Sequence, residues 1–265
     1  MTDLGALRRD LLDEQLALDA IVAGMSDADW AKTTASPGWT VADQIGHLTY
    51  FDGTAATAIT DPGAFAVNVQ ELHRSAGVSL DASDHLTLGA FRVLTPSDQL
   101  ATWRANRLLL EAASATLLEG ARVIWYGPSM GAKSFLTARL MEVWAHGIDI
   151  AQAIGVHPVA TDRLRHIAQL GYITRGWSYT VRGEQAPTGE LYLALRSPSG
   201  EVWQWGPSDA AETVTGSAEE FCMVVTQRAH VDDTQLELGP LGRDWLRKAQ
   251  AFAGRPTQGP APRSL

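Results

Sequence analysis

The chain has 265 residues, of which 45% are hydrophobic and 19% are charged, and its formal net charge is -9. This composition is typical of a globular protein and excludes an intrinsically disordered chain. The negative net charge and the scattered arginines exclude an electrostatic surface for nucleic acid or for anionic lipid.

The amino terminus and the cysteine content bear on location and metal chemistry. MTDLGALRRDLLDEQ carries charge at every turn, and no stretch reaches the roughly 20 apolar residues of a membrane span. We therefore expect a cytoplasmic protein without a membrane partner. Cys222 is the only cysteine, so an internal disulfide and a cysteine-built zinc site are excluded. Any metal has to be bound by histidines and carboxylates.

The first part of the chain is predicted to be almost entirely helical, because apolar residues recur at helical spacing and capping residues precede the runs. The expected helices cover residues 3–24, 27–30, 41–59, 62–76, 96–119, 135–153 and 161–182. The segment GVSLDASDH and the glycine-rich residues 127–133 are expected to be loops, and Ser134 is expected to cap the helix that follows. Long helices joined by short loops favour an antiparallel bundle.

The pattern changes after Gly183. ELYLALRS alternates apolar and polar residues as a half-buried strand does, and EVWQWG completes a hairpin. AETVTGSAEEFCMVVTQR predicts a strand and then a helix opened by Ser217, while QLELG predicts a short strand and LGRDWLRKAQAFAG a closing helix. We expect a helical domain over 1–183, a small α+β domain over 184–254 and a flexible tail over 255–265.

A polar stripe interrupts the otherwise apolar helix FLTARLMEVWAHGIDI. Arg139, Glu142, His146 and Asp149 fall within an arc of about 80°. The stripe could be the solvent-exposed face, with Glu142 and His146 as an i, i+4 pair. It could instead face inward and hold a cation, because a glutamate and a histidine one turn apart can reach the same zinc ion.

A third ligand has to come from another helix. The remaining histidines are His47, His73, His85, His157, His166 and His230. His47 stands out because it lies within a well-capped helix among apolar residues, although an ordinary core histidine fits that position too. Asp149 and Asp43 could orient the imidazoles, and Asp43 could equally cap its own helix. Arg139 could neutralise Glu142.

PGWTVADQIGHL, followed later by R-x-x-E-x-x-x-H-x-x-D, resembles the mycothiol-dependent maleylpyruvate isomerase family within the DinB-like group of four-helix metal proteins. The resemblance implies a four-helix bundle followed by a small α+β domain similar to a sterol-carrier fold. It also implies that His47, Glu142 and His146 bind zinc or another divalent metal, and that Arg228 reaches the active site. The implied thiol cosubstrate is mycothiol.

Two imidazoles and one carboxylate leave a fourth zinc position open, as in catalytic sites. A thiol bound there would be a thiolate at neutral pH. Its addition to an electron-poor double bond gives an isomer after elimination, or a thioether if the adduct is released. Cys222 lies in the apolar run FCMVV and is expected to be inert, so the thiol has to be a cosubstrate. Arg228 could bind a substrate carboxylate or stabilise enolate charge, or it could simply stabilise the fold.

Two alternatives stay open at this point. The same metal position could activate water for hydrolysis of a small molecule. A non-enzymatic protein could bind an apolar ligand through Trp203, Trp205 and Trp245, although core and hairpin packing explains those residues as well. Our prediction is a zinc-dependent thiol transferase or isomerase that acts on a small molecule, with a pocket between its domains, as a monomer or small homo-oligomer.

Overall fold

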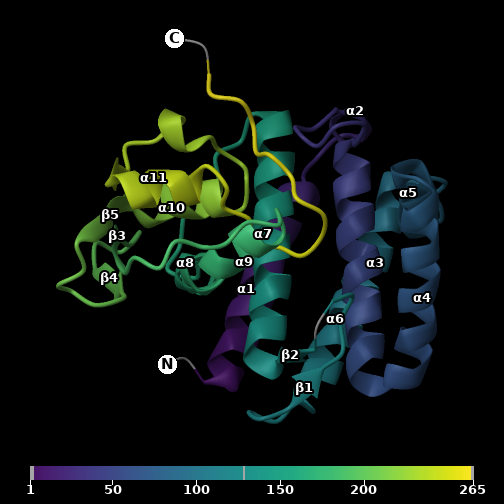
Figure 1. Ribbon diagram of the computed structural model, residues 1–265. Coiled ribbons are helices and arrows are strands. Elements are labelled where there is room, and N and C mark those ends of the chain that lie inside the picture. The colour runs from purple at the N-terminus through teal and green to yellow at the C-terminus, as the bar shows by residue number, and fades with distance from the viewer. Residues whose placement is uncertain (1–2, 128, 264–265) are drawn as a thin grey trace. The chain divides into compact units, whose positions relative to one another are not determined.

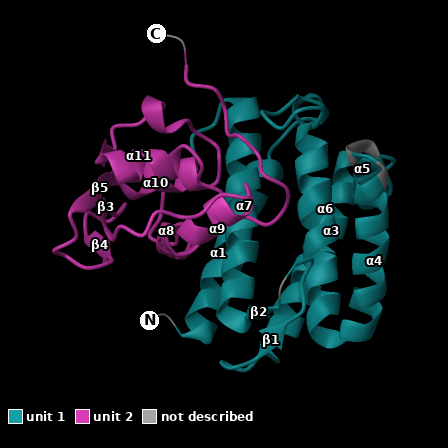
Figure 2. Cartoon of the chain, viewed as in Figure 1, with its two compact units in different colours: residues 1–158 teal, residues 159–265 magenta. Residues whose placement is uncertain are grey.

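The computed structural model describes residues 3–127 and 129–263. It divides into two compact units, residues 1–158 and residues 159–265, which Figure 2 colours separately. Figure 1 labels most of the helices and strands along the chain. The helices of the first unit are α1 (Leu4–Val22), α2 (Asp27–Trp30), α3 (Val41–Thr60), α4 (Pro62–Val78), α5 (Leu80–Leu88), α6 (Pro96–Ser114) and α7 (Ala132–Ile154), and its strands are β1 (Arg122–Val123) and β2 (Met130–Gly131).

Capping residues fix several helix ends where the sequence predicts them. Thr40 and Asp43 form a capping box at the start of α3, in which each side chain accepts a hydrogen bond from the other residue's backbone N–H. Ser26 and Asp29 form the same motif at α2. At the other end of α7, Gly155 adopts a left-handed conformation with φ 74°, which suits glycine. The register of α3 and the end of α7 are therefore set locally.

Three expectations for this unit are wrong. The segment GVSLDASDH is not a loop but mostly the helix α5, because Ser79 caps it and Leu88 is buried at its end. Within 127–133, β2 pairs with β1 as a short antiparallel ribbon. The helix α7 starts at Ala132, and its first turn has no side-chain cap, so Ser134 lies inside it.

Four helices, α1, α3, α6 and α7, form the bundle of the first unit (Figure 1). Each packs against two others, in the order α1, α7, α3, α6 and back to α1, while α4 and α5 pack against α3. Apolar side chains fill the interior in the manner expected of a helical bundle. Fully buried examples are Ile45, Leu48, Trp103, Leu110, Phe135, Leu136 and Leu140. This arrangement brings α3 and α7 side by side.

A charged pair lies at the centre of the bundle. Arg139 Nη2 on α7 donates to Asp52 Oδ1 on α3 at 2.8 Å, and the side chains are only 3% and 0% exposed. Gln15 Nε2 on α1 and Trp103 Nε1 on α6 both donate to Asp52 Oδ2 at 3.3 Å. Burial raises the pKa of Asp52, against the opposing effects of Arg139 and of the hydrogen bond from Trp103. One carboxylate therefore joins all four helices.

The second unit is an α+β fold, as expected. Its elements are α8 (Leu164–Ile173), α9 (Arg175–Thr180), β3 (Leu191–Arg196), β4 (Val202–Trp205), β5 (Glu212–Ser217), α10 (Ala218–Val225), the 3-10 turn η1 (Val231–Asp233), β6 (Glu237–Leu238) and α11 (Pro240–Leu246). The sheet has the order β4-β3-β5-β6. Strands β3 and β5 are parallel, and the two outer pairs are antiparallel. The helix α10 packs against α8, β3 and β5.

The helix expected over 161–182 is instead two helices, α8 and α9, which are separated at Thr174. The division between the units falls at residues 158 and 159 instead of 183 and 184, because α8 packs on α10 within the second unit. The approach is close, since a Cβ atom on Gly171 would lie 2.8 Å from Val225 Cγ2. This long-range contact has no local sequence signal.

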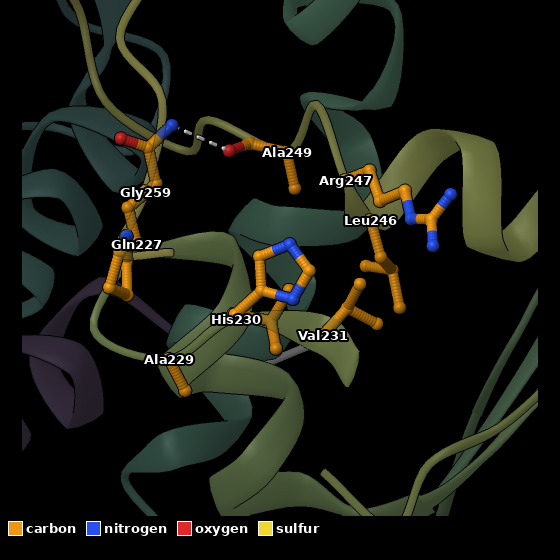
Figure 3. A pocket seen from close by; sticks show the side chains of 10 residues that line it. Gln227, Ala229, His230, Val231, Leu246, Arg247, Ala249 and Gly259 are labelled. Atoms are coloured by element: carbon orange, nitrogen blue, oxygen red, sulfur yellow. Dashed lines mark hydrogen bonds between the residues drawn. The ribbon is translucent and has the colours of Figure 1, made fainter. Parts of the chain in front are cut away.

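Residues 255–263, which follow the small domain and were expected to form a flexible tail, make contacts with the second unit. Thr257 Oγ1 donates to Gln227 Oε1 at 2.7 Å, and the backbone N–H of Arg263 donates to Asp233. Gly259 lines a small pocket together with Gln227 and other residues of this unit (Figure 3). The segment is thus hydrogen-bonded to the unit at several points.

The tryptophans considered for apolar-ligand binding have packing roles. Trp203 and Trp245 are 3% and 0% exposed in the core of the second unit. Trp205 Nε1 donates to Gln169 Oε1 of α8 at 2.5 Å. These contacts agree with the core and hairpin interpretation. In the part of the chain that the structure describes, no helix combines the length and the apolar character of a bilayer-spanning segment.

The central charged pair predicts a strong effect on stability. Substitution Asp52→Asn leaves the buried Arg139 guanidinium without its counter-charge, so we expect the free energy of unfolding to fall by about 3–5 kcal/mol. Chemical denaturation followed by circular dichroism measures this change. The double substitution Asp52→Leu with Arg139→Met removes both charges and should recover most of the loss.

The exposed Lys32–Asp29 pair provides the control, because Lys32 keeps 45% of its side-chain surface in solvent. Lys32→Ala should leave the unfolding midpoint unchanged. An Asp52→Asn protein as stable as the wild type would show that the pair has no such role.

Candidate metal centre

Two imidazoles and one carboxylate converge between α3 and α7. His47 Nε2 and His146 Nε2 lie 3.2 Å and 3.1 Å from the same oxygen, Glu142 Oε2. One ligand atom from each residue falls within 4.8 Å of the others. Among the described residues this is the one group of three or more histidine, cysteine or acidic side chains close enough to hold an ion. The three predicted ligands are therefore brought together.

The helices explain this convergence. Glu142 and His146 are one turn apart on α7 and so project from the same face. His47 projects from α3, which packs against α7 and starts at the Thr40–Asp43 cap. The centroids of the two imidazole rings are 4.3 Å apart. The donor atoms thus come from helices on a packed core and not from mobile loops.

Burial and mutual contact set the charge of the centre. The side chains of His47, Glu142 and His146 are 16%, 23% and 11% exposed. Burial, together with the neighbouring His146, lowers the pKa of His47 to about 4, so this imidazole is neutral near pH 7. Burial acts to raise the pKa of Glu142, but hydrogen bonds and charge from His146 and His47 hold it well below its usual range. Glu142 is therefore an anion facing a neutral imidazole.

The second nitrogen of His146 also has a defined partner. Gln44 Oε1 on α3 lies 2.5 Å from His146 Nδ1. Asp149, which the sequence suggested for this task, has its carboxylate 3.8 Å from the same nitrogen, beyond hydrogen-bond distance. Sequence reasoning therefore missed Gln44, although it stands within PGWTVADQIGHL, three residues before His47.

Aromatic side chains flank the two imidazoles. The Phe51 ring, one turn further along α3, has its centroid 4.6 Å from that of His47. The Trp39 ring lies 5.2 Å from His47 and 6.2 Å from His146. Trp39 Nε1 donates to Asp84 Oδ2 of α5 at 2.9 Å, which holds the indole in place. These rings limit the rotation of the imidazoles and part of their contact with water.

The other members of the polar stripe have separate partners. Arg139 pairs with Asp52, not with Glu142. Arg139, His146 and Asp149 are buried, so the interpretation of the stripe as a solvent face is wrong. Asp43 has the capping role at α3 and also pairs with Arg92 at 2.7 Å.

The other histidines and the cysteine do not join the centre. His73, His85 and His157 are exposed, while His166 and His230 belong to the second unit. Cys222 is fully buried in α10, and burial raises the pKa of its thiol well above its usual value. The thiol of Cys222 is therefore expected to be inert.

Arg228 belongs to the second unit and follows α10. Gln227 before it adopts a left-handed backbone with φ 61°, and Arg228 Nη1 donates to the carbonyl of Thr226 at 2.7 Å. This turn changes the direction of the chain directly after the helix. The structure thus gives Arg228 a defined local conformation.

Fold and donor set define a helical-bundle protein with a candidate metal centre of two histidines and one glutamate. Residues 11–151, more than half of the chain and including all three donors, match the family described as the mycothiol maleylpyruvate isomerase N-terminal domain. The chain belongs to this family. Residues 187–237 match a second family, described as wyosine base formation. The likeness of the second unit to a sterol-carrier fold stays a prediction.

The chain is also similar to two relatives and to two solved structures. Uncharacterized proteins from two strains of Mycobacterium tuberculosis are each 44% identical over 263 residues, which is 98% of this chain and 100% of theirs. Two crystal structures of the mycothiol-dependent maleylpyruvate isomerase, one of them a mutant, have a TM-score of 0.56. They are 18% and 19% identical and cover 86% of this chain and 90% of their own. At this identity the likeness shows a shared fold.

Proposed function

We propose that this protein is a zinc-dependent enzyme that uses a low-molecular-weight thiol, mycothiol, as cosubstrate. The observation that carries the proposal is the approach of His47 Nε2, His146 Nε2 and a carboxylate oxygen of Glu142 to within 4.8 Å of one another. Family membership supports the choice of thiol, because the matched domain is named for mycothiol and maleylpyruvate isomerase. The substrate is an electrophilic small molecule, and the product is an isomer or an S-adduct.

The donor set fits a divalent ion such as zinc. Imidazole nitrogen and carboxylate oxygen are common zinc ligands, and three protein ligands are typical of catalytic sites. His146 Nδ1 faces an amide oxygen, so this nitrogen carries the proton and Nε2 presents a lone pair to Glu142 Oε2. A metal ion between these two acceptors would interact with the lone pairs of both.

Each residue of the centre has a separate role in the proposed reaction. His47 and His146 supply neutral nitrogen ligands, and Glu142 supplies one negative charge. When bound, zinc lowers the pKa of a coordinated thiol, so that the sulfur is nucleophilic near neutral pH. Trp39 and Phe51 restrict the access of water to the imidazoles. Since Cys222 is buried and protonated, the reacting sulfur is that of the cosubstrate.

Arg228 is the residue that we propose for substrate binding. A guanidinium can bind a carboxylate through two parallel hydrogen bonds, and it can stabilise the negative charge of a forming enolate. The resemblance of the AETVTGSAEEFCMVVTQR segment to the isomerases supports this role.

Metal analysis tests the site. Purified protein should contain about one divalent ion per chain, and each of His47→Ala, Glu142→Gln and His146→Ala should lower zinc affinity at least 100-fold, since a ligand is lost. Elemental analysis and competition with a chelating dye measure content and affinity. His157→Ala is the matched control, because His157 is exposed and lies outside the centre. Full zinc occupancy in the His146→Ala protein would refute the assignment.

A thiol-consumption assay tests the chemistry. Zinc-loaded protein is incubated with mycothiol and with unsaturated acids, quinones or epoxides. If the product is an S-adduct, the protein should accelerate the loss of mycothiol. If the product is an isomer, the protein should accelerate isomerisation of the substrate in the presence of mycothiol. Mass spectrometry reads both the thiol and the products. The Cys222→Ala protein should keep full activity, because its sulfur takes no part. Turnover that proceeds equally well without any added thiol would instead indicate hydrolysis by activated water.

Steady-state kinetics test Arg228. Arg228→Met should raise KM for a carboxylate-bearing substrate about 10- to 100-fold, because a charged hydrogen bond contributes about 1.5–3 kcal/mol. Arg228→Lys should recover part of that loss, since it keeps the charge without the paired donors. Arg196→Met, at an exposed position of β3, should behave like the wild type. An unchanged KM in Arg228→Met would exclude the binding role.

A further inference from the structure

A chain of hydrogen bonds extends from the back of His146 into the loop that precedes α3. Gln44 Oε1 contacts His146 Nδ1, and Gln44 Nε2 lies 2.8 Å from Thr34 Oγ1 and 3.0 Å from Ser36 Oγ. Gln44 is fully buried, with 0% exposure. The oxygen and nitrogen of a glutamine amide have nearly the same shape and are assigned from their hydrogen-bond partners. The direction of these hydrogen bonds therefore depends on which partners can only accept or only donate.

Thr34 fixes one end of the chain. Its hydroxyl lies 3.1 Å from the backbone carbonyl of Trp39. A carbonyl oxygen can only accept, so the Thr34 hydroxyl is the donor in this contact, beside the Thr34 backbone N–H, which donates to the same oxygen at 2.9 Å. The Thr34 oxygen is then left to accept a hydrogen bond from Gln44. The amide nitrogen of Gln44 must therefore face Thr34, and its oxygen must face away.

Ser36 supports the same direction. Its hydroxyl lies 3.5 Å from Asp149 Oδ2, a long hydrogen bond in which the carboxylate oxygen is the acceptor. The Ser36 hydroxyl therefore points its hydrogen to Asp149, and its oxygen accepts from Gln44 Nε2. Two independent groups that can only accept, a backbone carbonyl and a carboxylate, thus orient the same amide.

The orientation of Gln44 determines where His146 carries its proton. Because Gln44 Oε1 faces Nδ1, that nitrogen must be the donor, and Nε2 is left free to coordinate. Without this constraint, a single ring proton would be more favourable on Nε2, where the Glu142 carboxylate oxygen Oε2 is 3.1 Å away. The hydrogen-bond chain therefore opposes the protonation that would block the metal-binding nitrogen.

We propose that Gln44 is a positioning residue that holds His146 with its proton on Nδ1 and its Nε2 available to a metal ion. Thr34, Ser36 and Asp149 act through Gln44 by orienting its amide. The metal-binding part of this inference rests on the proposed function. The hydrogen-bond part stands by itself and can be measured on metal-free protein. A merely structural glutamine would fill the core without any effect on the proton of His146.

Nitrogen NMR on metal-free protein with labelled histidine tests the inference, because long-range couplings show which ring nitrogen carries a proton. In the wild type, His146 Nδ1 should be protonated. The Thr34→Val/Ser36→Ala double variant removes the two hydroxyls that accept from Gln44 and leaves the residues that contact His146 unchanged. In this variant the side-chain amide of Gln44 can rotate so that its oxygen and nitrogen exchange positions. The proton of His146 should then move mainly to Nε2. The spectrum of His146→Gln identifies the signal.

Zinc affinity gives the second measurement. The double variant and Gln44→Leu should each bind zinc about 10- to 100-fold more weakly than the wild type, which is typical when a group that orients a ligand is removed. Gln44→Glu should bind more tightly than Gln44→Leu, because a carboxylate still accepts from Nδ1. Thr57→Val is the control, since the Thr57 hydroxyl bonds only to the carbonyl of Gly53 in its own helix.

The outcomes separate the two hypotheses. An Nδ1 proton on His146 and a zinc affinity that both stay unchanged in the double variant and in Gln44→Leu would overturn the role of Gln44. A wild-type protein with the expected Nδ1 proton that binds no zinc would overturn the proposed function and the metal-binding part of the inference. Thr34 and Ser36 are half-buried and lie in the loop before α3, outside the apolar core of the bundle, so the test does not depend on Gln44→Leu folding.

Discussion

The packing of α3 against α7 is the constraint on which the candidate centre depends. His47 comes from one helix and the Glu142–His146 pair from the other, so a displacement of either helix by one residue, about 1.5 Å, would separate the donors. The Asp52–Arg139 pair joins the same two helices with almost no exposure. Buried charges tolerate little misalignment, because an unpaired one is costly. The charged pair thus helps to specify the alignment that the centre needs.

The candidate metal centre has little net charge, but its three side chains point electron pairs at one another. A neutral His47, an anionic Glu142 and a His146 whose Nδ1 faces Gln44 all direct electron pairs to the same small volume. A positive charge among electron-rich groups gathered in this way stabilises them. The flanking Trp39 and Phe51 rings add apolar surface, so the local environment is drier than an exposed cluster of the same residues would be.

The second unit has a different design. A parallel pair of strands, β3 and β5, lies between antiparallel neighbours, and α10 packs against both, while α8 packs against α10 and β4. Trp203, Trp245 and Cys222 are buried and used for packing. Within this unit, Arg228 follows α10 and is the residue that the family resemblance singles out.

The sequence by itself determined the local features. The Thr40–Asp43 capping box, the glycine end of α7, the hairpin of β3 and β4 and the i, i+4 spacing of Glu142 and His146 each follow from residues that are close along the chain. Such features depend on backbone hydrogen bonds and on helix or strand periodicity, which operate over a few residues. Family resemblance added His47 to the ligand set.

Only the tertiary structure decided the partners across elements. Arg139 pairs with Asp52, and His146 Nδ1 contacts Gln44 in place of Asp149. In the second unit, α8 packs against α10. These pairs are separated by many residues, and periodicity shows which face of a helix is buried but not which side chain it meets there. Partner choice depends on helix packing and on the satisfaction of every buried polar group, and both are properties of the whole fold.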